Sequence, residues 1–309
     1  MKSKVLITVL SILLVSGCVD MGDLGIGQVA GIGGSGLEIT SFTAEPSSVF
    51  SGSSVRLVME VENLGGTTVP MNDGLVYLTG SSFSDWSGSN AIFESFSRDM
   101  RSEDVVRGVP ASTDRISRTV TAPDLQAGQT RNDIFIGRVY SDYQTSANGN
   151  VWAYSETEAE AARAAGRQMY TPSFTYTKGP VGLSISVTPT PLILYENEDT
   201  FTVFIKISNL ASGTIYAPGV INYGGSSVAL EMDDINRVNV SVTPGSGLSV
   251  TNSADCSGQQ ELVAGRDLTL VCDVTVSNPP ATFQSYTFDV TVSYGYYTER
   301  TATVTIQGR

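Results

Sequence analysis

Apolar and polar residues alternate in two stretches of the chain with a constant offset of 146 residues. The apolar positions are Val55, Leu57, Met59 and Val61 in the first stretch and Phe201, Val203, Ile205 and Ile207 in the second. Alternation with a period of two is typical of a β-strand that buries one face. Each stretch therefore predicts a strand at the surface of a hydrophobic core.

The two strands belong to a longer internal repeat, in which residues 36–69 align with residues 182–215 without a gap. The identical pairs are Gly36/Gly182, Leu37/Leu183, Ile39/Ile185, Asn63/Asn209, Leu64/Leu210 and Thr68/Thr214. Both strands run into a turn that carries the same asparagine, a residue that caps turns or adopts a left-handed conformation. The repeat predicts two copies of one structural unit.

Further strands follow each copy. Leu268, Leu270, Cys272, Val274 and Val276 alternate with other residues, and residues 286–294 and 296–306 flank Gly295. The second pair predicts a closing hairpin with Ala302, Val304 and Ile306 inward. We expect an all-β fold of two tandem β-sandwiches, the first with a long loop excursion and one short helix.

Two segments of the first copy resemble a known type of module. Residues 61–66 (Val-Glu-Asn-Leu-Gly-Gly) and the turn at residues 45–52 resemble immunoglobulin-like, CARDB or S-layer-associated domains of archaeal and bacterial envelope proteins. The second copy departs from this pattern, with Leu192, Glu198 and Ala211 in place of Pro46, Gly52 and Gly65. The resemblance implies immunoglobulin-like sandwiches displayed on a cell surface, and it supplies no catalytic residues.

Residues 36–178 and 179–309 are the expected sandwiches, joined by a hinge at Lys178-Gly179-Pro180. The first contains the excursion, residues 79–118. It also contains a predicted helix that begins at Ser155, where Glu158 completes a capping box.

The first 17 residues have the features of an export signal: Lys2 and Lys4, an apolar run over residues 5–15, and two small residues. Val15-Ser16-Gly17-Cys18 resembles the lipobox of prokaryotic lipoproteins, which implies cleavage before Cys18 and lipidation of its thiol. Residues 18–35 are rich in glycine and are expected to be a tether. The chain would then be exported and lipid-anchored to the outer side of the cell membrane; an ordinary cleaved signal with an incidental cysteine is the alternative.

Composition restricts the chemistry. The chain has 31 acidic and 18 basic residues, a balance that disfavours nucleic acid and anionic lipid as partners. It contains no histidine, so Ser-His-Asp and Cys-His catalysis and histidine metal sites are excluded. We expect no enzyme activity, no metal and no cofactor. The acidic groups at residues 196–199 and 233–234 are interpreted as solvated turn residues, with calcium binding or catalysis as alternatives.

Six further residues are candidates for specific roles. Cys256 and Cys272 form an even pair in an exported chain and predict a disulfide, with two free thiols as the alternative. Trp86 either offers a stacking surface to a sugar or pins the excursion onto the sandwich. Arg98 and Arg101 either contact an acidic partner or polysaccharide or are solvated and paired with local acids. Asn239 begins a glycosylation sequon within a predicted strand.

Together these patterns predict a lipid-anchored surface protein that acts as a structural or protein-interaction module of the envelope, held in the membrane through Cys18 and contacting another surface protein. One alternative is a carbohydrate- or calcium-binding lipoprotein. Another is a subunit of a surface filament or sheath, in which an exposed edge strand or the glycine-rich segment adds to a neighbour's sheet.

Overall fold

The computed structural model describes residues 34–195, 199–223 and 228–309. The predicted export signal, Cys18 and nearly all of the expected tether lie outside these residues, so what the sequence predicts for them stays a prediction. Within them the chain is built mainly of strands packed as sandwiches, which confirms the all-β prediction. No helix among the described residues combines the length and apolar character needed to cross a membrane.

The elements follow one another in three groups. The first comprises β1 (Leu37–Glu45), β2 (Ser48–Phe50), β3 (Ser54–Asn63), β4 (Gly74–Gly80), α1 (Phe83–Ser87), β5 (Ile92–Ser95) and β6 (Thr113–Thr121). The second comprises β7 (Thr130–Ser155), α2 (Glu156–Ala164), β8 (Ser173–Tyr176), β9 (Val181–Thr188), β10 (Leu192–Leu194), β11 (Thr200–Asn209) and β12 (Thr214–Tyr216). The third comprises the 3₁₀ turn η1 (Met232–Asp234), β13 (Arg237–Pro244), β14 (Leu248–Val250), α3 (Ser253–Cys256), β15 (Gly258–Glu261), β16 (Asp267–Val276) and β17 (Phe283–Gln307).

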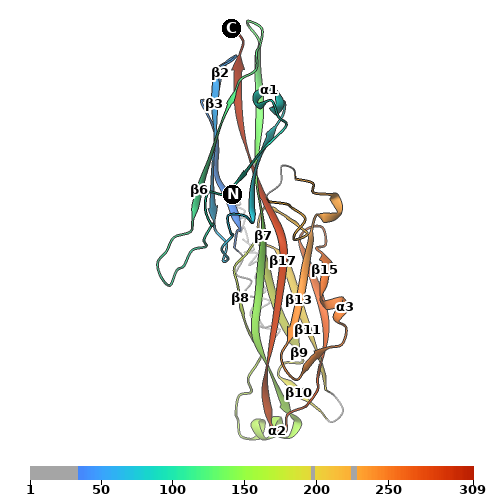
Figure 1. Cartoon of the computed structure of the whole chain (residues 1–309). Helices are drawn as coiled ribbons and strands as arrows, with labels where there is room; N and C mark the ends of the chain where they lie inside the picture. Colours follow the sequence, from blue (N-terminus) through green and yellow to red (C-terminus); the bar gives the residue numbers. More distant parts are fainter. Residues whose placement is uncertain (1–33, 196–198, 224–227) are drawn as a thin grey trace, which may run out of the picture.

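One ten-stranded sheet runs the length of the molecule, with the order β15-β13-β17-β7-β4-β5 along its main path (Figure 1). A sheet of order β1-β3-β6 covers its upper part, and a sheet of order β14-β16-β11-β9 covers its lower part. We call these two regions the upper and lower sandwich, and the level between them the waist. Even-numbered residues of β17 from Tyr286 to Ile306 are buried except at Arg300, so both smaller sheets lie on the same face of the large one.

The large sheet is held together by β7 and β17, which pair antiparallel from Thr130 opposite Gln307 to Tyr154 opposite Phe283. The expected hairpin at Gly295 is therefore wrong, because β17 passes straight through that residue. A Cβ atom at Gly295 would lie 1.9 Å from Cε2 of Tyr216, so the glycine makes room for a ring rather than for a turn. The inward orientation of Ala302, Val304 and Ile306 is confirmed.

Because β7 and β17 are continuous over their whole length, each of them contributes to both sandwiches. The upper half of β7 pairs with β4, whereas its lower half pairs with β8 and, in parallel, with β10. The lower half of β17 pairs with β12 and β13, whereas its upper end pairs in parallel with β2. In an immunoglobulin-type order, strands F and G of one sandwich are consecutive. Here each of the long strands β7 and β17 occupies the F position in one sandwich and the G position in the other.

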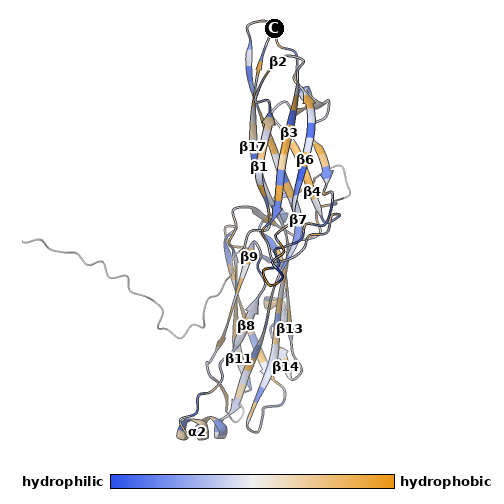
Figure 2. Ribbon diagram, turned by 90° about the vertical axis from the view of Figure 1, so that its left-hand side faces the viewer, coloured by the Kyte–Doolittle hydropathy of each residue, from blue (hydrophilic) through white to orange (hydrophobic). Residues whose placement is uncertain are grey.

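The boundary expected between residues 178 and 179 therefore does not separate two sheets. Strand β17 lies after this boundary, yet its upper half completes the sandwich built by β1–β6. Conversely, the lower half of β7 completes the sandwich built by the later strands. A single hydrophobic cluster extends through both regions. The ribbon in Figure 2 shows the two sandwiches end to end, with α2 at the lower end.

The internal repeat is visible in the structure. Strands β3 and β11 occupy equivalent central positions and keep the offset seen in the sequence. At their ends, Asn63 and Asn209 each donate from Nδ2 to the carbonyl four residues later and accept at Oδ1 from the amide two residues later. The shared asparagine thus makes the same turn in both copies.

The predicted helix after Ser155 and the predicted disulfide are confirmed. Ser155 caps α2 by accepting a 3.3 Å hydrogen bond from the Glu158 amide, but the predicted capping box is not completed, because the Ser155 amide donates to the Thr282 carbonyl instead. Cys256, in α3, and Cys272, in β16, form a disulfide with a Cα–Cα distance of 5.6 Å, and both are fully buried. The disulfide fastens α3 to the smaller sheet of the lower sandwich.

Candidate functional site

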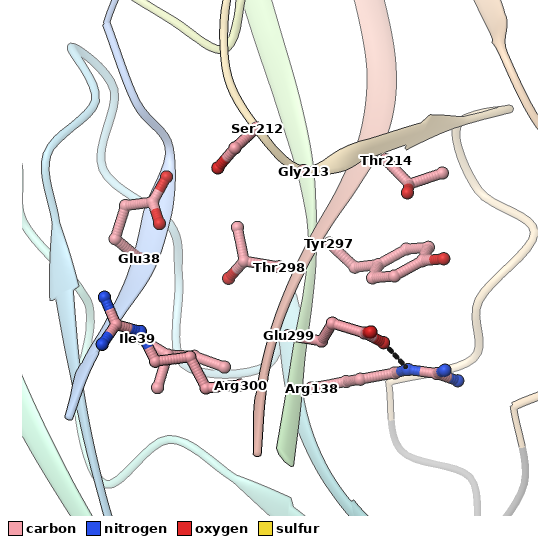
Figure 3. A pocket seen from close by; sticks show the side chains of 10 residues that line it. All are labelled: Glu38, Ile39, Arg138, Ser212, Gly213, Thr214, Tyr297, Thr298, Glu299 and Arg300. Atoms are coloured by element: carbon pink, nitrogen blue, oxygen red, sulfur yellow. Dashed lines mark hydrogen bonds and ion pairs between the residues drawn. The ribbon is translucent and has the colours of Figure 1, made fainter. Parts of the chain in front are cut away.

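A polar cleft of about 530 Å³ opens at the waist, and we call it the waist cleft. Its lining comes from β1, β7, β17, the start of β12 and the turn before β12 (Figure 3). The lining residues are Glu38, Ile39, Arg138, Ser212, Gly213, Thr214, Tyr297, Thr298, Glu299 and Arg300. Strand pairing accounts for the position of the cleft, because it lies where β17 leaves one sandwich and enters the other.

Beside this cleft β17 has an open edge. On the side away from β7, β17 pairs with β12 as far as Tyr297 and with β2 from Thr305 onward. No strand among the described residues pairs with that side over residues 298–304. An unpaired edge of this kind presents free backbone donors and acceptors to another strand.

The hydrogen bonds of β2 show which backbone groups face this edge. The amide of Thr305 donates to Ser47, and the carbonyl of Gln307 accepts from Ser51, so odd-numbered residues direct their backbone groups away from β7. Alternation along the strand gives Glu299, Thr301 and Thr303 the same direction. The open edge therefore offers their amide and carbonyl groups.

An ion pair borders the outer side of the cleft. Arg138 Nε donates a 2.8 Å hydrogen bond to Glu299 Oε2, and the guanidinium lies 5.6 Å from the centre of the Tyr297 ring. Burial is the largest single influence on the pKa of Arg138 and acts to lower it, but the interactions with Glu299 and Tyr140 together outweigh burial and the pKa is raised. Both side chains remain partly exposed, so this ion pair contributes more to the shape of the waist cleft than to the free energy of unfolding.

Glu38 lies on the opposite side of the cleft and is half-buried. Burial raises the pKa of Glu38 above its ordinary value, although hydrogen bonds to Ser35 and Tyr296 act in the opposite direction. Tyr296 donates a 3.4 Å hydrogen bond to Glu38 Oε1 and accepts one from the Gly213 amide. The Tyr296 hydroxyl thus contacts the carboxylate directly, and the Gly213 amide helps to position that hydroxyl.

A second hollow, of about 460 Å³, continues from the waist cleft over the outer face of the large sheet. The two share Arg138, Thr214 and Tyr297. Tyr77 and Tyr140 form its floor, and Met232, whose residue surface is 87 % exposed, stands at its border. The polar cleft and this aromatic hollow form one continuous strip across the waist.

Trp86 does not contribute to the strip. Its ring is buried, its centroid lies 5.1 Å from that of Phe135, and Nε1 donates a 2.6 Å hydrogen bond to Asp133. A buried indole has no face to offer a sugar, so the stacking interpretation is wrong and Trp86 pins α1 onto the sheet. Asp133 also pairs with Arg131 at 2.8 Å, which satisfies the buried carboxylate.

The two arginine candidates lie in the same excursion and line neither hollow at the waist. Arg98 is exposed and donates to the Thr113 carbonyl at 2.7 Å. Arg101 is also exposed. A partner contact through either side chain stays a prediction.

Asn239 is exposed in β13, where it lies opposite Gln259 and Ser293 in the ladders, and its glycosylation stays a prediction. Asp233 and Asp234 lie in η1, and Asp234 accepts a hydrogen bond from the Glu231 amide. Across the part of the chain that the structure describes, no cluster of three or more histidine, cysteine, aspartate or glutamate side chains is placed to hold a metal.

Sequence reasoning missed the residues that build the waist cleft. The sequence pattern assigns Tyr297, Glu299 and Arg300 to a hairpin strand and does not distinguish Arg138. The missed signal was that charged residues interrupt an otherwise threonine-rich strand at Glu299 and Arg300. The structure shows that this interruption coincides with the open edge.

A group of aromatic residues is exposed at the lower end of the molecule. Trp152 of β7, Tyr170 after α2 and Phe283 of β17 have ring centroids 4.6 to 6.4 Å apart. Tyr170 is 57 % exposed and Phe283 44 % exposed. We call this group the aromatic tip.

Comparison with known proteins gives no family. No protein-family model matches the chain, and no curated protein matches it. The solved structures that resemble it include the Pseudomonas fluorescens alkylpurine DNA glycosylase AlkC, with 10 % identity and a TM-score of 0.23 over 34 % of this chain and 27 % of that one. A Salmonella alpha-2-macroglobulin mutant matches with 8 % identity and a TM-score of 0.24 over 88 % of this chain and 16 % of that one.

The D0-D1 domain of intimin also resembles the chain, with 10 % identity and a TM-score of 0.19 over 87 % of this chain and 98 % of that domain. The chain thus spans under a third of the glycosylase and of the macroglobulin. Likenesses of this size carry no argument about function, which must come from the chain itself.

Proposed function

We propose that the chain is an exported surface protein, lipid-anchored through Cys18, that acts as a protein-interaction module of the envelope. The export signal and Cys18 support the location. The observation that carries the interaction role is the open edge of β17 beside the waist cleft. The proposal includes no catalytic residue, cofactor or nucleic acid.

The open edge suits an extended segment of a partner protein. Backbone groups of Glu299, Thr301 and Thr303 would pair with the segment, as in recognition by strand addition. Residues 298–304 give a strand length of about 23 Å. Side chains on one face of the segment would enter the waist cleft beside Glu38 and Arg300, and those on the other would meet Glu299 and Arg138.

The anchor and the edge are tested by separate variants. Cys18→Ser should move the protein from the membrane fraction to the soluble fraction, and continued membrane association would contradict the anchor. Thr301→Pro removes an outward amide while leaving the pairing with β7 intact. Proximity labelling on intact cells should lose specific neighbours with Thr301→Pro and keep them with Thr301→Val; identical neighbours in both would contradict the role of the edge.

The aromatic tip supports a second candidate function, carbohydrate binding. Aromatic side chains combine large apolar faces with little loss of conformational freedom, which suits contact with the apolar face of a sugar ring. Titration calorimetry with envelope polysaccharides should give binding that Tyr170→Ala reduces at least tenfold. Absence of binding by the unmodified protein would remove this candidate.

A further inference from the structure

We infer that the open edge of β17 receives residues 24–32 of a second copy of this chain. The inference rests on the proposed function, because it identifies the segment that the edge accepts. It combines the open edge, the shape of its surroundings, the sequence pattern before β1 and the direction in which the chain enters β1.

The first argument is the pattern of residues 24–32, Leu-Gly-Ile-Gly-Gln-Val-Ala-Gly-Ile, which precede the described residues. Leu24, Ile26, Gln28, Ala30 and Ile32 share one parity, and Val29 and the three glycines of the segment share the other. A strand with this pattern would have one mainly apolar face, interrupted by Gln28, and one nearly bare face. The segment also carries no charge, so pairing would desolvate no ionised side chain of the segment.

The second argument is that the open edge is flanked. Strand β12 ends at its lower side and β2 begins at its upper side, and Ser212 and Gly213 also line the waist cleft there. A single free strand fits between β12 and β2, whereas the edge of another folded sheet would collide with these two strands. The nine residues of the segment are sufficient for the gap over residues 298–304.

The inward side chains of the added strand would meet the waist cleft. Ile39 of β1 and Ala302 and Val304 of β17 lie on that side of the sheet and are already buried, so the added strand would extend the core at their margin beside the polar lining of the cleft. A strand added at the edge would place its inward side chains over the space between β1 and β17. The bare glycine face would then point outward, beside Glu299 and Thr301.

The third argument concerns which copy supplies the segment. The Leu64 amide donates to the Gly36 carbonyl and the Gly34 amide donates to the Gly179 carbonyl, so residues 34–36 continue β1 toward the lower sandwich. The open edge runs from the waist in the opposite direction, toward the upper end. The described chain before β1 therefore runs away from the open edge of its own copy, so residues 24–32 are assigned to the edge of a neighbouring copy, which they would enter without a reversal of the chain.

Such a contact is head-to-tail, because the donating segment and the accepting edge are different surfaces. Repeated head-to-tail contacts form a closed ring only if the rotation between copies brings the last donor segment back to the first open edge. Otherwise they form an open chain of copies. Each copy would donate one strand and accept one.

The test uses residues 18–309 with Cys18→Ser, so that the chain carries no lipid. Light scattering after size exclusion should show species whose mass grows with concentration. Ile26→Asp with Ile32→Asp removes the donor, and Thr301→Pro removes the acceptor; each variant alone should have the mass of one copy. Their mixture should give two-copy species and nothing larger, because one competent donor meets one competent edge. Thr301→Val and Ile26→Val are the matched controls and should assemble as the parent does.

Amide hydrogen exchange at Thr301 and Thr303 provides a second measurement that does not depend on the proline variant folding. The inference expects protection that rises with protein concentration and disappears in the donor variant. Protection at the mass of one copy would mean that the segment folds back on its own edge, and it would overturn the inference. A mass of one copy with no protection of the Thr301 and Thr303 amides would also overturn the inference. In that case, loss of labelled neighbours by the Thr301→Pro variant on cells would still support the proposed function.

Discussion

The hydroxyl of Tyr143 donates a 2.6 Å hydrogen bond to Oδ1 of Asn63, and both side chains are buried at the waist. Tyr143 lies near the middle of β7, whereas Asn63 ends β3 in the upper sandwich. Asn63 also donates to the carbonyls of Thr67 and Met100 at 2.8 and 2.7 Å. One asparagine thus joins the long strand, a turn and the excursion.

Replacing this asparagine is expected to cost more than replacing its counterpart. Asn63→Ala would leave buried groups without partners, including the Tyr143 hydroxyl, and should lower the free energy of unfolding by roughly 2–4 kcal/mol. Asn209→Ala, at a half-buried site with longer bonds, should cost about 1 kcal/mol. Urea unfolding of both variants tests this, and equal losses would contradict the difference in burial.

Exchange of the long strands predicts that the two halves of the chain depend on each other. Residues 34–178 expressed alone lack the strand that completes the upper sandwich, and residues 179–309 lack the one that completes the lower sandwich. Neither fragment should show a cooperative thermal transition by circular dichroism. Together they should copurify and recover one transition.

The matched control is the intact chain cut by a protease at a site inserted beside Gly179. The cut chain should keep the mass of the uncut one on size exclusion. Two fragments that fold separately with sharp transitions would show that the exchanged strands are dispensable.

The sequence predicted the parts of the fold that depend on local pattern. Alternation located β3 and β11, and the paired asparagines located the turns that follow them. What it did not reveal was the path of β17, because a hairpin and a straight strand share the same alternation. Gly295 is ambiguous in a sequence, since glycine serves both a turn and a close approach of another side chain. Only the ring of Tyr216 shows which role applies.

The waist cleft was beyond sequence reasoning for the same reason. Its walls come from Glu38, Arg138 and Glu299, which are far apart in the chain and meet only because β7 and β17 pair along their whole length. The burial of Trp86 was also beyond local sequence patterns. Its neighbours in sequence are small and polar, but its burial depends on Phe135 and Asp133 of a distant strand.

Removal of the disulfide should weaken the lower sandwich. Cys256 and Cys272 are 16 residues apart, and closing a loop of this length stabilises a folded chain by roughly 3 kcal/mol. The double variant Cys256→Ala with Cys272→Ala should lower the unfolding free energy by about that amount in urea. Since both halves share β7 and β17, the whole transition should shift; a separate early transition would contradict a single cooperative unit.

Glu38 predicts a dependence of stability on pH. Burial raises its pKa in the folded chain above the ordinary value of 4.5, so the folded state binds more protons than the unfolded state just above that value. Its contribution is therefore present below pH 4.5 and is lost as the pH rises through the folded pKa. Asp142, whose pKa burial also raises, acts in the same direction.

Glu38→Gln should consequently raise the melting temperature more at pH 7 than at pH 4.5. Thermal scans of both proteins across this range provide the measurement, with Glu261→Gln at an exposed position of β15 as the control. A larger gain at the lower pH would contradict the assigned direction.

The continuity of β17 also has a consequence for the order of events during biosynthesis. The upper sandwich begins at residue 37 and is completed by residues near 307, so it cannot close before the residues near 307 have been made and delivered. A nascent chain with this topology stays open while it is still emerging. For a protein threaded through a translocation pore, that delay keeps the polypeptide slender until passage is over, and the β7–β17 ladder then forms as a late step.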